Sequence, residues 1–414
     1  MQPVLDETIK TPAAGIFANR GFRLFYAGQA LSYLGDGLRS LAIPLLVFKL
    51  TGSALTLGVT YALQFFPFAV AGLLGGSLAD RLDRRRLLIA CDFVRFAIVT
   101  LFVVGGVRGF LSLPLIYIGV ALISVSAAIF LGGQSSSIPF LLGRQAAAPA
   151  NAALIATEQS ANLVAPPLGG ALFSLGGPVP ALALNALTYL SSLFAIAKIP
   201  SLGPEKPASL PSLREVAHDI ASGFGFLTAD AAMNTITWLS LFLNLFGMMA
   251  MAVYIPFYKL ELGASDAQVG LTLGVNAIGA VTGSLLAGKY ANKWPFGKAL
   301  CIAYIIDGVV FVPVMFTHHL WVAATFFSLA NAGATFETAQ IISWRMRVVP
   351  LEKIGRVFGA VRLIAIIGVV PGSLLGGYLA DHFGVRTPIV VSTIGYLILA
   401  LSAIAVRAVR TDTR

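Results

Sequence analysis

The sequence predicts an all-α membrane protein with twelve transmembrane helices, arranged as two pseudo-symmetric six-helix bundles. Three observations support this prediction: the composition, the recurrence of long apolar stretches, and a repeat that relates the two halves. Of the 414 residues, 57% are hydrophobic and only 11% are charged. Soluble domains carry about 25% charged residues. Lipid is therefore the expected solvent for most of this chain.

Apolar stretches long enough to cross a bilayer, which takes about 20 residues, recur along the whole sequence. In the first half, Ser53–Leu78 is uninterrupted, and Gly109–Gly143 contains one helix and a loop. Gln159–Ala197 is long enough for two helices, and the turn signal Gly176–Pro180 divides it. In the second half, the clearest stretches are Ala231–Tyr258, Ala267–Gly288 and Thr387–Val406. The predicted helices are 22–48, 54–79, 87–107, 113–135, 148–175, 180–198, 232–258, 267–290, 298–317, 320–344, 356–380 and 387–407.

The distribution of Lys and Arg predicts the orientation in the membrane. Of the 28 basic residues, Lys49, Arg108, Lys259 and Arg386 lie in the odd-numbered loops, and three lie inside predicted helices. The remaining basic residues lie in the even-numbered loops and the tails. Because basic loops stay in the cytoplasm, both termini are predicted to be cytoplasmic. The net charge of +10 then reflects topology, and nucleic-acid binding is not expected.

Other site chemistries find little support in the sequence. Cys91 and Cys301 both lie in apolar stretches and imply no disulfide framework. Residues 1–10 lack the basic-then-apolar order of a cleavable signal. Gly283–Tyr290 resembles a phosphate-binding loop but lacks its closing Ser or Thr and a preceding strand. With four histidines and no nucleophile motif, we expect no metal site, no cofactor and no enzymatic activity.

The two halves resemble each other. A shift of 212 positions pairs Gly35 with Gly247 and Gly58 with Gly270, and a shift of 207 pairs 168–170 with 375–377. Duplicated halves around a central cytoplasmic loop are typical of transporters, with the binding site between the halves near mid-membrane. A capping-box pattern at Ser212 predicts a short surface helix in the linker. The predicted units are a tail (1–21), a six-helix bundle (22–199), a linker (200–231), a second bundle (232–407) and a tail (408–414).

The second predicted helix ends in an ordered motif, Gly76-Ser77-Leu78-Ala79-Asp80-Arg81-Leu82-Asp83-Arg84-Arg85-Arg86. A glycine allows close helix approach, a carboxylate lies at the membrane edge, and a basic cluster anchors the loop. The motif resembles the loop signature of the major facilitator superfamily, Gly-x-x-x-Asp-Arg-x-Gly-Arg-Arg, with Asp83 in place of the second glycine. Residues 288–293 resemble a decayed second copy, in which Asn292 replaces the aspartate.

Two further segments extend the resemblance over essentially the whole chain. Ala165-Pro166-Pro167-Leu168-Gly169-Gly170 is similar to the helix-five motif of the family's antiporters, although Ala165 replaces its first glycine. The opening, 19–36, resembles the branch that holds enterobactin exporters and macrolide efflux proteins. The resemblance implies that Asp80 contacts the N-terminal end of helix eleven, and that Gly76, Arg81 and Arg84 belong to the same gating loop.

Ionisable residues inside predicted helices are candidates for proton coupling, because the membrane penalises each of them. Asp36 has Arg39 one turn later on the same helix face, so the two form either a structural pair or a pair that protonation breaks. Glu337 has no basic partner within a turn and is an equal candidate, followed by Glu158 and Asp307. Arg362 is expected to contact the other half, and Asp92 with Arg95 is expected to be a structural pair.

The resemblance places the substrate cavity on helices one, four, seven and ten. Amide and aromatic side chains there suit a bulky, partly apolar ligand. The candidate cavity residues are Gln29, Ser32, Tyr33, Arg39, Gln134, Asn234, Trp238, Asn244 and Asn331.

The sequence therefore predicts a monomeric secondary transporter of a bacterial inner membrane. Its expected partners are a small-molecule substrate, protons and the lipid bilayer, and its expected activity is proton-coupled export of a drug-like or siderophore-like molecule. Three alternatives stay open: an uptake carrier or uniporter without proton coupling, a non-transporting scaffold or lipid-handling protein of the same fold, and a membrane enzyme. Fold alone does not decide between them.

Overall fold

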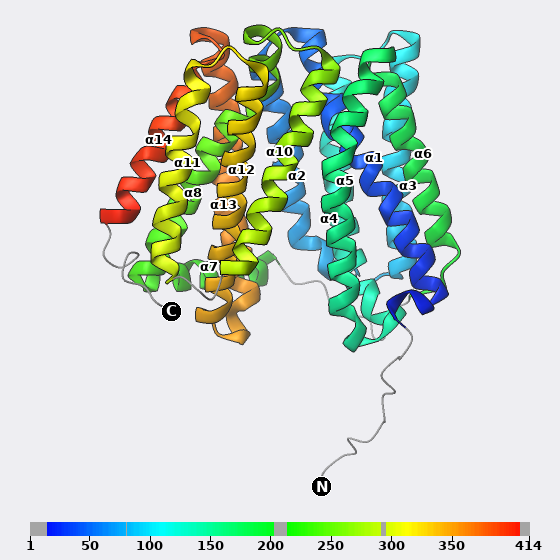
Figure 1. Cartoon of the computed structure of the whole chain (residues 1–414). Coiled ribbons are helices and arrows are strands. Elements are labelled where there is room, and N and C mark those ends of the chain that lie inside the picture. Colours follow the sequence, from blue (N-terminus) through cyan, green and yellow to red (C-terminus); the bar gives the residue numbers. More distant parts are fainter. Residues whose placement is uncertain (1–14, 80, 203–212, 291–294, 406–414) are drawn as a thin grey trace.

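The computed structural model describes residues 15–79, 81–202, 213–290 and 295–405. Its helices run side by side between two faces of the molecule (Figure 1). Both ends of the described chain lie on one face, together with the transverse helix α7 (Leu213–Ala229). We call this the terminal face, and the other the opposite face.

Every long element of the described chain is a helix. The N-terminal half consists of α1 (Arg20–Thr51), α2 (Ala54–Ala79), α3 (Arg84–Arg108), α4 (Leu113–Leu142), α5 (Ala147–Gly176) and α6 (Pro178–Ala197). The C-terminal half consists of α8 (Ala231–Ala252), which continues through α9 (Tyr254–Pro256) and a wider turn (Phe257–Glu261), then α10 (Asp266–Tyr290), α11 (Phe296–Phe316), α12 (Leu320–Val348), α13 (Ile354–Phe383) and α14 (Thr387–Ala405). Short helical turns cover Ile16–Ala18, Arg144–Ala146 and Leu351–Lys353. The predicted fold class, with six long helices in each half, is confirmed.

Ten of the helices are long and apolar enough to cross a membrane by length and composition alone. α5 and α12 have the length, at 30 and 29 residues, but are not among the ten. Both helices contribute amide side chains to the central cavity, as described below.

The predicted helix boundaries hold except where polar residues suggested an early end. Helix four was predicted to end at 135, before a run of serines, but α4 continues to Leu142. The reason is local: the Ser136 and Ser137 hydroxyls donate to backbone carbonyls one turn earlier, at Gly132 and Gly133. The surface helix α7 is also longer than predicted, whereas residues 1–14, 203–212, 291–294 and 406–414, including Asn292, lie outside the described chain.

The repeat seen in the sequence appears in the packing. Gly35 of α1 lies against α6 at Thr188, and its repeat partner Gly247 of α8 lies against α14 at Tyr396. Similarly, Gly58 lets α2 approach α13, and its partner Gly270 lets α10 approach α5. Small residues allow such close helix contacts in membranes. The duplicated glycines therefore form equivalent contacts in the two halves, and the second pair lies where the halves meet.

Candidate functional site

Near the opposite face, the two halves meet through glycines on both of their interfaces. Between α5 and α10, a methyl group on Gly170 would collide with the backbone of Gly270. Between α2 and α13, a methyl group on Gly377 would collide with the backbone of Ala54. The backbones are thus in direct contact at both points, and no larger side chain fits there without a shift. Gly170 belongs to the antiporter-like motif of helix five, whereas its neighbour Gly169 packs on Leu38 of α1.

An acidic residue joins the halves on the same face. Asp381, near the end of α13, accepts hydrogen bonds from the backbone N–H of Ala54 at 2.7 Å and of Leu55 at 3.1 Å, and from the Ser53 hydroxyl. These groups form the N-terminal end of α2, where N–H groups lack helical partners and negative charge is favourable. We call this set of contacts the Asp381 clasp.

The clasp belongs to a further copy of the loop motif. Gly377-Tyr378-Leu379-Ala380-Asp381 repeats the Gly-x-Leu-Ala-Asp pattern of residues 76–80. The described residues of the first copy, 76–79, end α2 at the terminal face, and the second copy lies near the end of α13 at the opposite face, on two helices that pack against each other. Sequence comparison at half-chain spacing missed this copy, because it relates helices two and eleven rather than two and eight.

A central cavity of about 450 Å³ lies between the halves. Ser40 of α1 and Tyr61 of α2 line it from one half, and Tyr254 and Met251 line it from the other. Its remaining polar lining is mainly amide: Gln64, Gln159, Asn162, Asn276 and Asn331. No charged side chain lines the cavity within the described chain, so its surface suits neutral hydrogen-bonding groups beside apolar ones.

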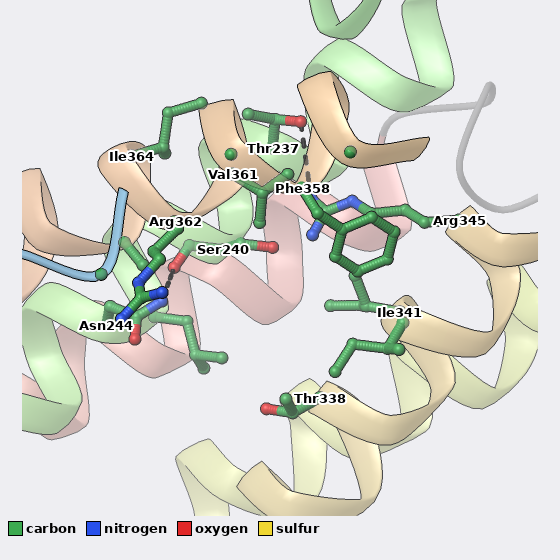
Figure 2. Close-up of a pocket in the computed structure, with 16 residues that line it drawn as sticks. Thr237, Ser240, Asn244, Thr338, Ile341, Arg345, Phe358, Val361, Arg362 and Ile364 are labelled. Carbon is green, nitrogen blue, oxygen red and sulfur yellow. Dashed lines mark hydrogen bonds between the residues drawn. The ribbon is translucent and has the colours of Figure 1, made fainter. Parts of the chain in front are cut away.

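A larger cavity of about 650 Å³ lies nearer the terminal face and is lined by α2, α8, α12 and α13 (Figure 2). We call it the terminal-side cavity. Its polar lining comprises Thr237, Ser240, Asn244, Thr338, Arg345 and Arg362. Arg362 Nη2 is 3.4 Å from the Phe68 carbonyl oxygen of α2, and its guanidinium lies 5.1 Å from the centre of the Phe68 ring. The expected contact of Arg362 with the other half is therefore confirmed.

The predicted cavity residues separate into two groups. Asn331 lines the central cavity and Asn244 lines the terminal-side cavity. Others bond within the N-terminal half: Gln29 donates to the Ser192 hydroxyl at 3.1 Å, and Gln134 donates to the Tyr33 hydroxyl at 2.8 Å. Trp238 is 55% exposed on α8. The predicted residues that line neither cavity are Gln29, Ser32, Tyr33, Arg39, Gln134, Asn234 and Trp238.

Four intramembrane charges of the N-terminal half form one cluster. Arg39 pairs with Asp36 at 3.0 Å, and the Tyr189 hydroxyl of α6 donates to the same Asp36 oxygen. Tyr189 also lies under the guanidinium of Arg95, which is 4.9 Å from the ring centre and pairs with Asp92. Tyr189 thus connects two ion pairs that the sequence presented as separate. The remaining candidate of this half, Glu158, is exposed on α5.

In the C-terminal half, Asp307 of α11 and Glu337 of α12 lie together. Their exposed fractions are 1% and 0%. A carboxylate oxygen of Asp307 lies against Gly333, one turn before Glu337, and the Tyr304 hydroxyl faces Glu337. Within the described chain, neither carboxyl group makes a hydrogen bond of normal geometry. Burying two such groups without partners is costly, so the pair is a candidate for function rather than for stability.

The predicted gating loop is described in part. Gly76 lies in the last turn of α2, and Asp80 lies outside the described residues, so its implied contact with helix eleven stays a prediction. Arg81 is partly buried. Arg84 lies over the ring of Phe140, 4.1 Å from its centre, within the N-terminal half.

Asp83, which replaces a glycine of the family motif, begins α3. Its side chain accepts from the backbone N–H of Arg85 at 2.9 Å and of Arg86 at 3.3 Å, as an N-cap does. The Ser201 hydroxyl, beyond the end of α6, also donates to it. The departure from the motif therefore has a structural role, since it ties the start of α3 to the start of the linker.

Sequence reasoning missed most of the cavity lining. The amides Gln64, Gln159, Asn162 and Asn276 stand out only once their helices are known to face each other. The predicted tenth helix ends at residue 344, which places Arg345 in a loop. α12 in fact continues to Val348, and Arg345 is 3% exposed. Basic residues near a helix end indicate the orientation in the membrane, and their spacing does not reveal that Arg345 lines a cavity.

Comparison with known proteins agrees with this architecture. Macrolide efflux protein A of Streptococcus pyogenes is 23% identical over 406 residues, which cover 92% of this chain and 94% of the relative. Enterobactin exporter EntS of Salmonella typhi is 24% identical over 392 residues, which cover 92% and 90%.

Among solved structures, the nucleoside transporter NupG has a TM-score of 0.74 at 11% identity, covering 93% of this chain and 98% of NupG. A bacterial homologue of the iron transporter ferroportin, in an inward-facing state, has a TM-score of 0.71 at 16% identity, covering 93% and 98%. The family model described as Major Facilitator Superfamily matches residues 25–370. Because that match spans most of a chain with this fold, the protein belongs to the Major Facilitator Superfamily of transporters.

Proposed function

We propose that this transporter exports small, partly hydrophobic molecules from a bacterial cytoplasm by alternating access, in exchange for protons. The observation that carries the proposal is an asymmetry between the two faces. Near the opposite face, glycine contacts and the Asp381 clasp hold the halves together. Toward the terminal face, the halves enclose cavities of about 450 and 650 Å³. A bundle that is closed at one face and hollow toward the other is one state of an alternating-access cycle.

The orientation assigned to this state comes from the sequence. Basic residues gather in the loops and tails of the terminal face, which makes that face cytoplasmic by the positive-inside rule. The protein would then lie in the inner membrane with both termini in the cytoplasm, and its cavities would receive substrate from the cytoplasm. The similarity to a macrolide efflux protein and an enterobactin exporter supports export as the direction of transport.

Proton coupling is assigned first to Asp307 and Glu337. The two carboxyl groups are buried together beside Tyr304. Within the described chain, neither accepts a hydrogen bond from a basic side chain. Asp36 is the second candidate, because Tyr189 and Arg39 both hold the same carboxylate, and protonation would weaken both contacts. Either site can change its packing when it takes up a proton, as a coupling residue must.

The test is transport in proteoliposomes with an imposed pH gradient and a panel of dyes, macrolides and siderophores. We expect substrate flux to accelerate when protons can move in the opposite direction. Glu337→Gln should abolish this acceleration while keeping substrate exchange without a gradient, and the exposed Glu352→Gln is the matched control. Flux that ignores the gradient would refute antiport in favour of a uniporter, and the absence of flux for the whole panel would refute export.

A further inference from the structure

The terminal-side cavity contains positive charge with no negative charge opposite it. Two of its lining residues are arginines, Arg345 and Arg362, and within the described chain none is an aspartate or glutamate. Figure 2 shows the two guanidinium groups on opposite sides of the cavity, with Thr237 beside Arg345 and Ser240 on the side of Arg362. Any ligand in this cavity would lie between two cations.

Arg345 is the more informative of the two, because it is buried and nearly without partners. Its side chain is 3% exposed, and its one hydrogen bond to a described residue is a long one, 3.5 Å from Nη2 to the Thr237 hydroxyl. Its Nε is buried and makes no hydrogen bond in the described chain. A guanidinium has five N–H donors, so most of its hydrogen-bonding capacity is unused.

A buried guanidinium with most of its N–H donors unpaired needs a physical explanation. Breaking or omitting the partner of a buried charge is strongly destabilising. Arg345 lies in the last turn of α12, where helix dipoles favour a cation, but this effect is smaller than the cost of burying an unpaired guanidinium. An anion inside the cavity would supply the missing partner, and the planar guanidinium binds carboxylate and phosphate oxygens with two parallel hydrogen bonds.

The apolar residues of the lining restrict the rest of the ligand, beyond its acidic group. Leu243, Ile341, Phe358, Val361 and Ile364 present apolar surface to the same cavity. The volume of about 650 Å³ lies within the range of small-molecule sites. A ligand with an acidic group and an apolar or aromatic body would satisfy the arginines and the apolar wall together.

We infer that the terminal-side cavity binds amphipathic organic anions, with Arg345 as the anchor of the acidic group and Arg362 as the second positive charge of the lining. This inference rests on the proposed export function, because it names the class of substrate that would enter from the terminal face. An anionic lipid headgroup has the same chemistry and is the other source of such a ligand.

The inference is tested by binding, which is independent of flux. The full chain in nanodiscs of neutral phosphatidylcholine would be titrated with radiolabelled 2-naphthoate and with its neutral match, 2-naphthamide. We expect the wild type to prefer the acid, and Arg345→Gln to weaken acid binding about tenfold or more, since charged hydrogen bonds contribute about 1.5–3 kcal/mol. Binding of the amide should not change, which shows that the variant is folded. Arg345→Lys should retain part of the preference.

Arg347→Gln is the matched control, because Arg347 lies on the same helix end but is exposed and lines neither cavity. Repeating the titration in phosphatidylglycerol nanodiscs separates the two sources: unchanged binding assigns the site to soluble acids, and Arg345-dependent competition assigns it to lipid headgroups. No binding of 2-naphthoate to the wild type, or the same acid preference in Arg345→Gln, would overturn the inference. Either negative result, together with normal flux of neutral compounds, would leave the proposed export function intact.

Discussion

Removing the carboxylate of Asp381 should open the opposite face of this transporter. The carboxylate accepts two backbone hydrogen bonds, at 2.7 and 3.1 Å, and one from Ser53, all at the N-terminal end of α2. These contacts cross between the halves and exist only while that face is closed. Asp381→Asn keeps an acceptor but loses the charge, and Asp381→Ala loses both.

The magnitudes follow from the geometry and the exposure of the site. A negative charge at an exposed helix N-terminus contributes about 0.3–1 kcal/mol. Loss of a capping acceptor costs about 0.5–2 kcal/mol, typically near 1. Asp381→Asn should therefore shift the equilibrium between closed and open states of this face by up to about fivefold. Asp381→Ala should shift it by about twofold to 30-fold.

The assay is a distance measurement between spin labels across the closed face. Leu50, 50% exposed near the end of α1, and Phe383, 67% exposed at the end of α13, provide one labelling position in each half. Cys91 and Cys301 are replaced by serine in this background. We expect a longer-distance population to grow in the order wild type, Asp381→Asn, Asp381→Ala.

Glu261→Gln is the matched control for this experiment. Glu261 is an acidic residue on the same face, but its ion pair with Arg386, at 2.9 Å, lies within the C-terminal half. Its loss should not change the distance distribution. An Asp381→Ala distribution identical to that of the wild type, in a protein that expresses normally, would refute the clasp.

Three further predictions follow from other contacts. Gly170→Val should prevent closure of the opposite face, because its side chain would collide with α10. Overpacking of this kind costs about 1–3 kcal/mol, so substrate flux should fall by about tenfold or more. Gly288→Ala, whose added methyl group meets open space, should transport normally in the same vesicle assay. Asp83→Ala should lower thermal stability in detergent by the equivalent of about 1 kcal/mol, the usual cost of a lost N-cap, and unchanged melting would contradict the capping role. Partial burial opposes ionisation of Asp83, but hydrogen bonds from Ser201 and from backbone N–H groups outweigh it and lower the pKa of its carboxyl below 3.8. Because the pKa is lower in the folded state, the ionised carboxylate stabilises the folded protein at neutral pH, and this stabilisation is lost as the pH falls below about 4. Wild type and Asp83→Ala should therefore melt alike in acid and differ at pH 7.

The fold was largely predictable because a lipid bilayer allows few backbone structures. Apolar stretches of membrane length can only be helices, so α2, α10 and α14 follow closely from hydropathy and turn residues. The ends of α4 and α12 were less predictable. Whether Ser136 bonds to its own helix, or Arg345 enters a cavity, depends on neighbours that hydropathy does not register.

Individual residues of the candidate site were predictable from the sequence, but the contacts between them were not. Asp307 and Glu337 were each identified as costly charges, but their proximity across α11 and α12 was not. Asp36 and Arg39 were paired correctly from their spacing, whereas Tyr189, which connects them to Arg95, comes from a helix far along the chain. Spacing along one helix reveals partners within a turn, and it contains no information on which face of a neighbouring helix will be opposite.

The sequence by itself determined the solvent, the number of spanning helices, the duplication and the family, since these depend on composition and on local patterns along the chain. Only the tertiary structure decided at which face the halves are in direct contact, through Asp381 and the glycine contacts, and which polar groups share a cavity, through Arg345 and Arg362. The physical reason is that these properties belong to pairs of surfaces. The residues of a helix are known from the sequence wherever the helix lies, but a contact between the halves depends on how two helices face each other.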